Sequence, residues 1–217
     1  MVKYKLTNKN MRTYGGFQWE LGVLAHKEND VGEKGLCSDV FYHWYHSPLM
    51  AVLMNSINSD IDDPRLFECE VGGEVRDEYG LKGGSTSCML VRELELPVIT
   101  NRQRVAFGIL CAIKVHKDEY FSAWAVRWLS GEDRTEETAA AVEQAMEKTE
   151  PKMKEQALDE EAMVAARMAA RAAARTAGTW LVEVWAAESA AAAARIGSDL
   201  GKELDIQSIA EQAVKDY

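Results

Sequence analysis

The amino-acid sequence predicts an α+β fold, in which a small domain with a mixed or antiparallel sheet and two packed helices precedes an alanine-rich region made only of helices. Three observations support this prediction. Short apolar runs alternate with glycine-rich turns over about the first hundred residues, which is typical of short strands. Two helix-length apolar patterns follow, and alanine, the best helix former, then dominates the chain.

The first domain is expected to span residues 1–131. Its predicted strands cover residues 4–6, 17–20, 41–45, 65–71, 73–76 and 86–94. Glycine pairs predict turns at residues 15–16, 72–73 and 83–84. One helix is expected between the strands, from a Ser47 cap through Asn55, because Pro48 suits the first position of a helix.

Two amphipathic helices complete this domain. Thr100 and Gln103 have the spacing of a capping box, which predicts a helix that begins there. A second helix is expected from about Asp118, because Phe121, Trp124 and Trp128 recur at helical spacing. We expect both helices to pack on the preceding sheet, since their apolar faces need a partner.

The second domain is expected to span residues 132–217, as a helical hairpin or bundle. Helices are predicted over residues 134–149, 151–177, 179–195 and 206–216. Pro151 is expected to break the helical run, because proline lacks a backbone donor. Gly178, Gly197 and Gly201 are further expected weak points, and Asp205 is expected to cap the last helix.

The composition restricts the kinds of partner. The chain has 25 Lys and Arg against 35 Asp and Glu, which gives a formal net charge of −10. This sign argues against direct nucleic-acid binding, where affinity comes from neutralising phosphates. The sequence has neither an apolar run of about 20 residues nor an apolar centre in residues 1–21, so we expect a cytoplasmic protein with no membrane association.

The cysteines and histidines suggest a metal site only weakly. Cys37, His43 and His46 form the pattern C-x5-H-x2-H, which lacks the paired knuckles typical of zinc. We interpret His43 as a core or rim residue and His46 as an exposed one, with Tyr45 between them as a further binding candidate. The cysteines are expected to be reduced core thiols. No catalytic residue, metal or cofactor is predicted.

One basic line and two tryptophans are the binding candidates of the tail. Arg167, Arg171 and Arg175 recur every four residues, so they share one helix face. They form either a rail for an acidic partner or phosphate backbone, or ion pairs with nearby acidic helices, and we favour the ion pairs. Trp180 and Trp185 are expected to anchor an interface, either inside the chain or in a homo-oligomer.

Several ordered motifs of residues 1–131 resemble a family of uncharacterised phage and prophage proteins. They are KYKLTNKNM (3–11), GFQWELG (16–22), Leu36-Cys37, YHWYHSPL (42–49), PRLFECEVGGEV (64–75), RELELPVIT (92–100) and NRQRVAFGILCAI (101–113). Many members of this family also carry alanine-rich helical tails. By position the resemblance equates His43 with the family's aromatic-His residue, and it implies a phage setting without implying a reaction.

These observations lead to three functional expectations. The first is a non-enzymatic phage or prophage accessory protein that binds and inhibits a host protein, for example one of a bacterial defence system such as CRISPR. The second is an enzyme that uses NAD, because Ser85-Thr86-Ser87 and Glu93-Leu94-Glu95 loosely resemble elements of ADP-ribosyltransferases; His43, Tyr45, Glu93 and Glu95 would then surround the cofactor. The third is a structural homo-oligomer built on the tail.

Overall fold

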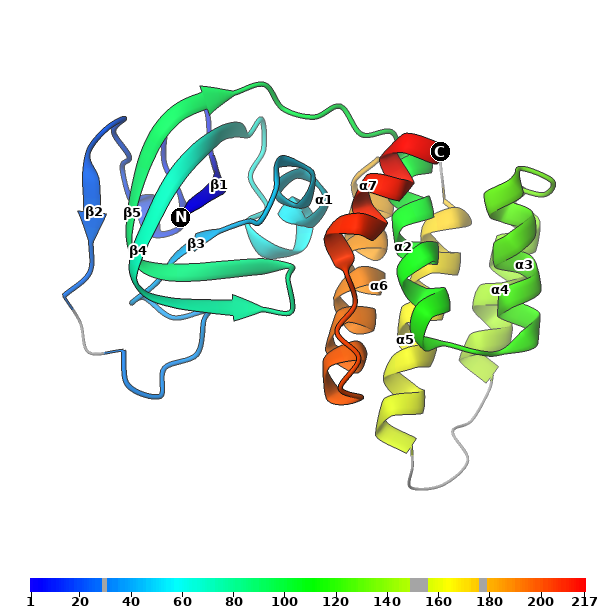
Figure 1. The fold of residues 1–217 in the computed structure, drawn as a ribbon. Coiled ribbons are helices and arrows are strands. Elements are labelled where there is room, and N and C mark those ends of the chain that lie inside the picture. Colours follow the sequence, from blue (N-terminus) through cyan, green and yellow to red (C-terminus); the bar gives the residue numbers. More distant parts are fainter. Residues whose placement is uncertain (29–30, 149–155, 176–178) are drawn as a thin grey trace. The chain divides into compact units, whose positions relative to one another are not determined.

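The computed structural model describes residues 1–28, 31–148, 156–175 and 179–217. The chain divides into two compact units, Met1–Val98 and Ile99–Tyr217. In Figure 1 the first unit holds the sheet together with one helix, and the second unit holds the remaining labelled helices. The predicted α+β fold with a helical C-terminal region is therefore confirmed.

The sheet of the first unit is antiparallel and closes on itself. Its strands are β1 (Val2–Thr7), β2 (Leu24–His26), β3 (Tyr42–Trp44), β4 (Arg65–Glu78) and β5 (Lys82–Leu94). The strand order is β1-β4-β5-β2, and β3 also pairs with β5. Tyr4 and Tyr45 then exchange two backbone hydrogen bonds, of 3.0 and 2.7 Å. These bonds join the end of β3 to β1 and complete a small barrel.

Two of the predicted glycine turns are wrong. β4 runs through residues 72–73 with only a register irregularity between Gly72 and Val75, as expected of a bulge. The real turn is at Tyr79 and Gly80, where both φ angles are positive, 56° and 73°. Gly83 lies inside β5. A Cβ atom at this position would overlap the indole ring of Trp44. Glycine is needed at this position for close packing rather than for a turn.

The segment before β2 also differs from the prediction, because residues 17–20 do not form a strand. Trp19 is buried, and its Nε1 donates a hydrogen bond of 2.9 Å to Thr13 Oγ1. The Gln18 side chain donates to the carbonyl of Asn10 at 3.0 Å. These bonds hold the chain in a loop. Gly22 N then donates to Leu90 O at 2.8 Å, and the strand forms after it, at β2, which pairs with β5.

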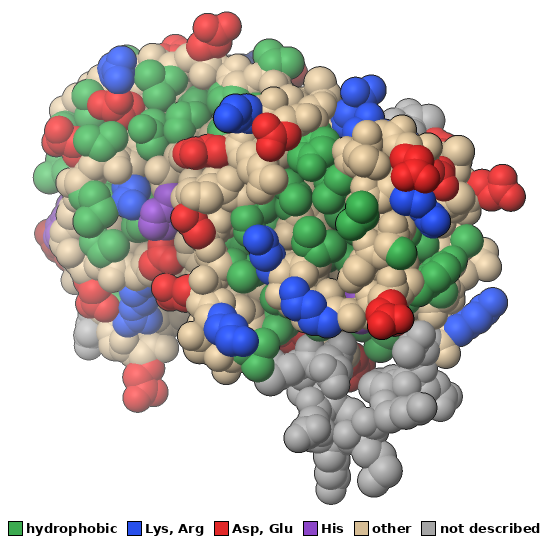
Figure 2. All heavy atoms as spheres, turned by 45° about the vertical axis from the view of Figure 1, so that its right-hand side comes forward, with side chains coloured by type: hydrophobic (Ala, Val, Ile, Leu, Met, Phe, Trp, Pro, Cys, Tyr) green, Lys and Arg blue, Asp and Glu red, His purple; other side chains and the backbone are tan. Residues whose placement is uncertain are grey.

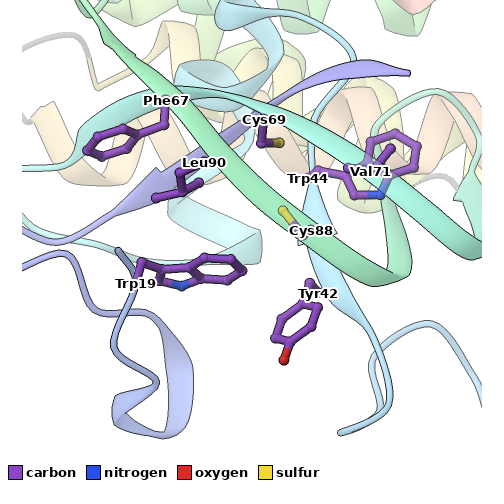
Figure 3. Close-up of a cluster of buried hydrophobic side chains, with 8 residues drawn as sticks. All are labelled: Trp19, Tyr42, Trp44, Phe67, Cys69, Val71, Cys88 and Leu90. Atoms are coloured by element: carbon purple, nitrogen blue, oxygen red, sulfur yellow. The ribbon is translucent and has the colours of Figure 1, made fainter. Parts of the chain in front are cut away.

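A cluster of buried side chains lies between these strands (Figure 3). Its members are Trp19, Tyr42, Trp44, Phe67, Cys69, Val71, Cys88 and Leu90. Helix α1 (Pro48–Asn58) packs against β1, with Met50, Leu53 and Met54 buried. Ser47 caps α1 by accepting a hydrogen bond of 3.2 Å from Met50 N, which confirms the predicted helix start.

The second unit is built around one central helix. Its elements are α2 (Asn101–Val115), α3 (Glu119–Ser130), α4 (Glu136–Lys148), α5 (Gln156–Ala173), α6 (Thr179–Asp199) and α7 (Ile206–Asp216). Helix α2 packs against α5, α6 and α7. The predicted capping box is present at Thr100, and Asp205 caps α7 as predicted. Asp118, the predicted approximate start of the second helix, caps α3.

The division between the units falls after Val98, whereas the sequence placed it after Gly131. The reason is the packing of α2, whose buried face is covered by the alanine-rich helices of its own unit. Gly108 allows this approach, since a Cβ atom there would lie 3.3 Å from Ala186 Cα. Ser189 Oγ lies 3.0 Å from Gly108 O and 2.8 Å from Ala165 O, so one hydroxyl links α6 to two other helices.

The expected weak points of the tail have different outcomes. Pro151 and Gly178 lie outside the described residues. Gly197 lies within α6, which continues to Asp199, so the predicted helix end at residue 195 is wrong. A Cβ atom at this glycine would lie 2.7 Å from Lys202 O, and glycine therefore lets the following loop fold back closely. Gly201 follows the helix with a φ of 65°, where the chain does change direction.

Candidate functional site

His43 and Tyr45 are both held by hydrogen bonds inside the first unit. His43 Nε2 lies 2.7 Å from Leu36 O, so this nitrogen carries the proton and donates. Burial lowers the pKa of His43, although the bond to Leu36 opposes the shift. Tyr45 Oη lies 3.0 Å from Ser59 Oγ, and burial raises the pKa of Tyr45 to about 12. Both side chains therefore stabilise the fold.

His46 links β1 to β4. Its Nε2 contacts Asp77 Oδ2, and its Nδ1 lies 3.0 Å from Lys3 Nζ. Burial alone would raise the pKa of Asp77, but hydrogen bonds from His46 and Gly80 outweigh it and lower the pKa. The carboxylate therefore accepts from Nε2–H, and Nδ1 accepts from the Lys3 ammonium. The expected exposed histidine is instead an internal bridge between two charges.

Cationic side chains of this unit stack on its aromatic rings. The pairs are Lys3 over Trp44, Lys5 over Trp19, Lys27 over Tyr42 and Arg76 over Phe41, at 4.6 to 5.1 Å from the ring centroids. Lys5 is buried, donates to His43 O at 2.5 Å, and has a pKa lowered by burial. These cations are therefore engaged in contacts within the fold.

The pattern C-x5-H-x2-H does not form one site. Cys37 Sγ accepts a hydrogen bond from Lys82 at 3.2 Å, while His43 donates to a carbonyl and His46 to a carboxylate. Each member thus has a different partner. Among the described residues, no group of three or more His, Cys, Asp or Glu side chains is arranged to hold a metal ion.

The residues expected around a nicotinamide cofactor are also separated. Glu93 makes a bidentate ion pair with Arg65, with distances of 2.7 and 2.6 Å. His43 pairs with Gly84, far from Glu93 along β5. At roughly 3.3 Å per residue, the strand contour between Gly84 and Glu93 is about 30 Å. The arrangement therefore does not bring the histidine and the glutamate into one pocket.

The arginines of the tail face their own unit. Arg171 Nε donates to Glu143 Oε1 at 2.5 Å and a second nitrogen to Glu147 Oε1 at 3.0 Å, while Arg175 donates to Glu143 Oε2 at 3.0 Å. Both guanidinium groups also stack on Trp185, at 5.5 and 4.9 Å. The cluster joins α4, α5 and α6, as the ion-pair interpretation expected.

Arg167 and Trp180 are the two remaining binding candidates of the tail. Arg167 is partly buried on α5. The side chain of Trp180 lies outside the described residues. The predicted basic rail is therefore reduced to two arginines that are already paired with glutamates.

The sequence reasoning missed an exposed apolar segment that precedes and includes the start of β2. We name it the apolar segment 14–24. Large hydrophobic side chains are exposed along it: Tyr14 by 102%, Phe17 by 38%, Leu21 by 50%, Val23 by 52% and Leu24 by 63%. The adjacent apolar residues Val23 and Leu24 were the available sign, because two neighbours in a strand point to opposite faces and cannot both face one core.

The free edge of β2 lies beside this segment. β2 pairs with β5 on one side, and within the described part of the chain its other side meets no strand. An edge strand carries unpaired backbone donors and acceptors that a partner chain can use. The apolar segment 14–24 and this edge together form a surface that offers both apolar area and backbone hydrogen bonds.

A polar hollow adjoins the apolar segment. It has a volume of about 340 Å³ and is lined by Asn8 to Asn10, Arg12 and Thr13 on one wall and by residues 60–63 on the other. Asn8 Oδ1 accepts hydrogen bonds of 2.9 Å from Asn10 N and Arg12 N, while Asn55 binds both backbone groups of Ile61. Both walls are therefore fixed by side-chain amides before any ligand arrives.

Elsewhere the surface has mixed charge. On the face drawn in Figure 2, acidic and basic side chains are interspersed with hydrophobic ones. Helices long and apolar enough to span a bilayer do not occur in the described parts of the chain.

No family model, no curated protein and no solved structure was found to match this sequence.

Proposed function

We propose that this chain is a binding protein of a phage or prophage, which acts in the bacterial cytoplasm by docking on a host protein and inhibiting it. The resemblance of residues 1–131 to phage proteins supports the setting and favours a defence-system protein, such as a CRISPR component, as the partner class. The exposed apolar segment 14–24 beside the free edge of β2 is the observation that carries the proposal.

The energetics of this surface favour a protein partner. Burying a fully exposed large apolar side chain contributes roughly 1.5–3 kcal/mol. Leu21, Val23 and Leu24 are only half to two-thirds exposed, so together they offer on the order of 3 kcal/mol. Association costs about 4–15 kcal/mol in lost freedom of motion. Apolar contact alone therefore falls short, and backbone hydrogen bonds to β2 are needed to make the complex stable.

The charges next to the segment define the partner further. Glu20 is exposed within the segment itself. The hollow has mixed charge, with Asp60, Asp62 and Asp63 on one wall and Lys9 and Arg12 on the other. We therefore propose that the partner presents an extended strand with apolar side chains and a nearby basic side chain. Such a strand would pair with β2 and place its positive charge beside Glu20, in line with charge complementarity between partners.

A pair of variants with matched exposure tests the proposal. Leu24→Lys alters the surface, and Val126→Lys changes a residue of α3 that is exposed to a similar degree, 66% against 63%. Tagged proteins are used to capture partners from bacterial lysate, and a captured protein is then purified and its affinity measured by calorimetry.

The proposal expects a specific partner that binds the unchanged chain and Val126→Lys, with an affinity at least tenfold weaker for Leu24→Lys. Hydrogen exchange within residues 14–28 should slow in the complex. Capture that is equal for both variants would refute the role of this surface. Self-association of the purified chain that Leu24→Lys abolishes, seen by light scattering, would instead assign this surface to contact between two copies of the chain and refute a host partner there.

A further inference from the structure

Cys37 differs from the other three cysteines in its access to solvent. It lies between β2 and β3 and is exposed, whereas Cys69, Cys88 and Cys111 are buried. A reagent in solution therefore reaches only one of the four thiols in the folded protein. The backbone just before this thiol is fixed, because His43 Nε2 donates to Leu36 O at 2.7 Å.

A buried amine lies against this thiol. Lys82 Nζ donates to Cys37 Sγ at 3.2 Å and also lies 3.2 Å from Glu78 Oε2. Lys82 is 8% exposed and opens β5, where its backbone pairs with Glu78. The Lys82 amine thus lies between the Glu78 carboxylate and the Cys37 sulfur. Lys82 is the buried member of the pair, and Cys37 is the exposed one.

We infer that Cys37 and Lys82 are a modification site at which peroxide produces a covalent cross-link. The exposed sulfur is the nucleophile, and it lies within hydrogen-bond distance of the Lys82 amine. Sulfur attacks one peroxide oxygen and the O–O bond breaks, which converts Cys37 to sulfenic acid and releases water. Sulfur is oxidised by two electrons, and the peroxide is reduced by two.

The adjacent amine completes the reaction. Lys82 gives up one proton, for which Glu78 is the nearest acceptor, and its nitrogen then attacks the sulfur of the sulfenic acid. An S–N bond forms, the S–O bond breaks, and a second water leaves. The net change is the loss of two hydrogens from the protein. A second peroxide can insert one oxygen into this bond and leave as water, which gives an S–O–N bridge between the same residues.

The cross-link would tie the segment between β2 and β3 to the start of β5. This inference does not depend on the proposed binding function, because it concerns different residues and needs no partner protein. Its consequence is a covalent restraint on the residues that lead into β3, which a thiol reductant removes.

Mass spectrometry of the full chain tests the inference. After treatment with hydrogen peroxide and removal of the excess, a non-reducing digest should contain a peptide that joins Cys37 to Lys82, and dithiothreitol should abolish it. Lys82→Arg keeps the positive charge but lacks a reactive amine, so oxidation should stop at a sulfenic acid that dimedone labels. Lys34→Arg, a change in the same segment as the thiol, should cross-link like the unchanged chain.

Glu78→Gln provides a second variant in which both reacting atoms remain, so the outcome does not depend on whether Lys82→Arg folds normally. It should still form the cross-link, at a rate several-fold lower if Glu78 accepts the proton. Equal dimedone labelling of the unchanged chain and Lys82→Arg, with no cross-linked peptide, would overturn the inference. So would a product that joins Cys37 to Lys34, or to Cys37 of a second chain.

Discussion

Tyr45→Phe removes one hydroxyl from the interior of the first unit, and its effect on stability is expected to change sign with pH. At pH 7 the unchanged protein has the hydrogen bond between Tyr45 and Ser59. A bond of this kind contributes about 0.5–1.5 kcal/mol. The phenylalanine variant should therefore be less stable by about 1 kcal/mol at neutral pH.

Alkaline pH reverses this difference. Burial raises the pKa of Tyr45 from 10.0 to about 12, so the folded state resists ionisation more than the unfolded state does. The corresponding stability is fully present below pH 10 and is lost as the pH rises toward 12. One pKa unit corresponds to about 1.4 kcal/mol, so near pH 11 the loss equals the hydrogen bond. Above that pH the phenylalanine variant should be the more stable protein.

Urea unfolding between pH 7 and pH 11.5 measures this crossover. The two proteins contain the same other titrating groups. The contributions of those groups therefore cancel in the difference between the two free energies of unfolding. Tyr14→Phe serves as the control, since the Tyr14 side chain is fully exposed, and it should follow the unchanged protein at every pH. A difference between Tyr45→Phe and the unchanged protein that stays constant with pH would refute the reasoning.

Three further substitutions test the packing. Gly83→Ala should lower the free energy of unfolding by about 1–3 kcal/mol or more, because its Cβ would overlap a buried indole ring, whereas Gly35→Ala, with open space around it, should be neutral in the same thermal melts. Ser189→Ala should cost the helical unit about 1 kcal/mol in urea unfolding, since it removes a buried hydroxyl bonded to two helices. Glu143→Gln should cost about 1–3 kcal/mol and Glu147→Gln under 1, because the Glu143 side chain is 9% exposed and the Glu147 side chain 44%; equal effects in calorimetry would contradict this ranking.

Helices were predictable from this sequence where a local chemical sign marked their starts. Ser47, Thr100, Asp118 and Asp205 each accept a hydrogen bond from a backbone amide of the first turn, and such caps depend only on residues nearby in the sequence. The position of Gly197 was misjudged, because its role depends on a loop that returns against the helix. Local patterns contain no information about that contact.

The sheet was less predictable, because its glycines serve packing between distant segments. Gly83 lies in a strand, and its lack of a side chain leaves room for the indole ring of Trp44. No local pattern distinguishes this role from that of a glycine in a turn. The division between the units was missed for a related reason. The apolar face of α2 indicates that the helix is buried, but not whether the sheet or the alanine-rich helices cover it.

The candidate sites show the same limit. The sequence correctly indicated that Arg171 and Arg175 pair with acidic helices, since both contact Glu143, although α5 ends at Ala173 and Arg175 lies just beyond it. It did not identify the partners of His46, because Lys3 and Asp77 come from two other strands. The pairing of Cys37 with Lys82 was equally hidden, as it depends on how the loop before β3 returns to the start of β5.

The closure of the barrel has a consequence for the order in which the first unit folds. β1 is synthesised before its partner strand β4, with which it pairs Lys5 with Phe67 and Leu6 with Leu66. Contacts between residues so far apart in the chain form slowly, because a long loop must close first. The β4–β5 hairpin and helix α1 are local and can form early. During translation β1 therefore stays unpaired until β4 has left the ribosome. Until then the side chain of Lys5, which is buried in the folded unit, remains in water.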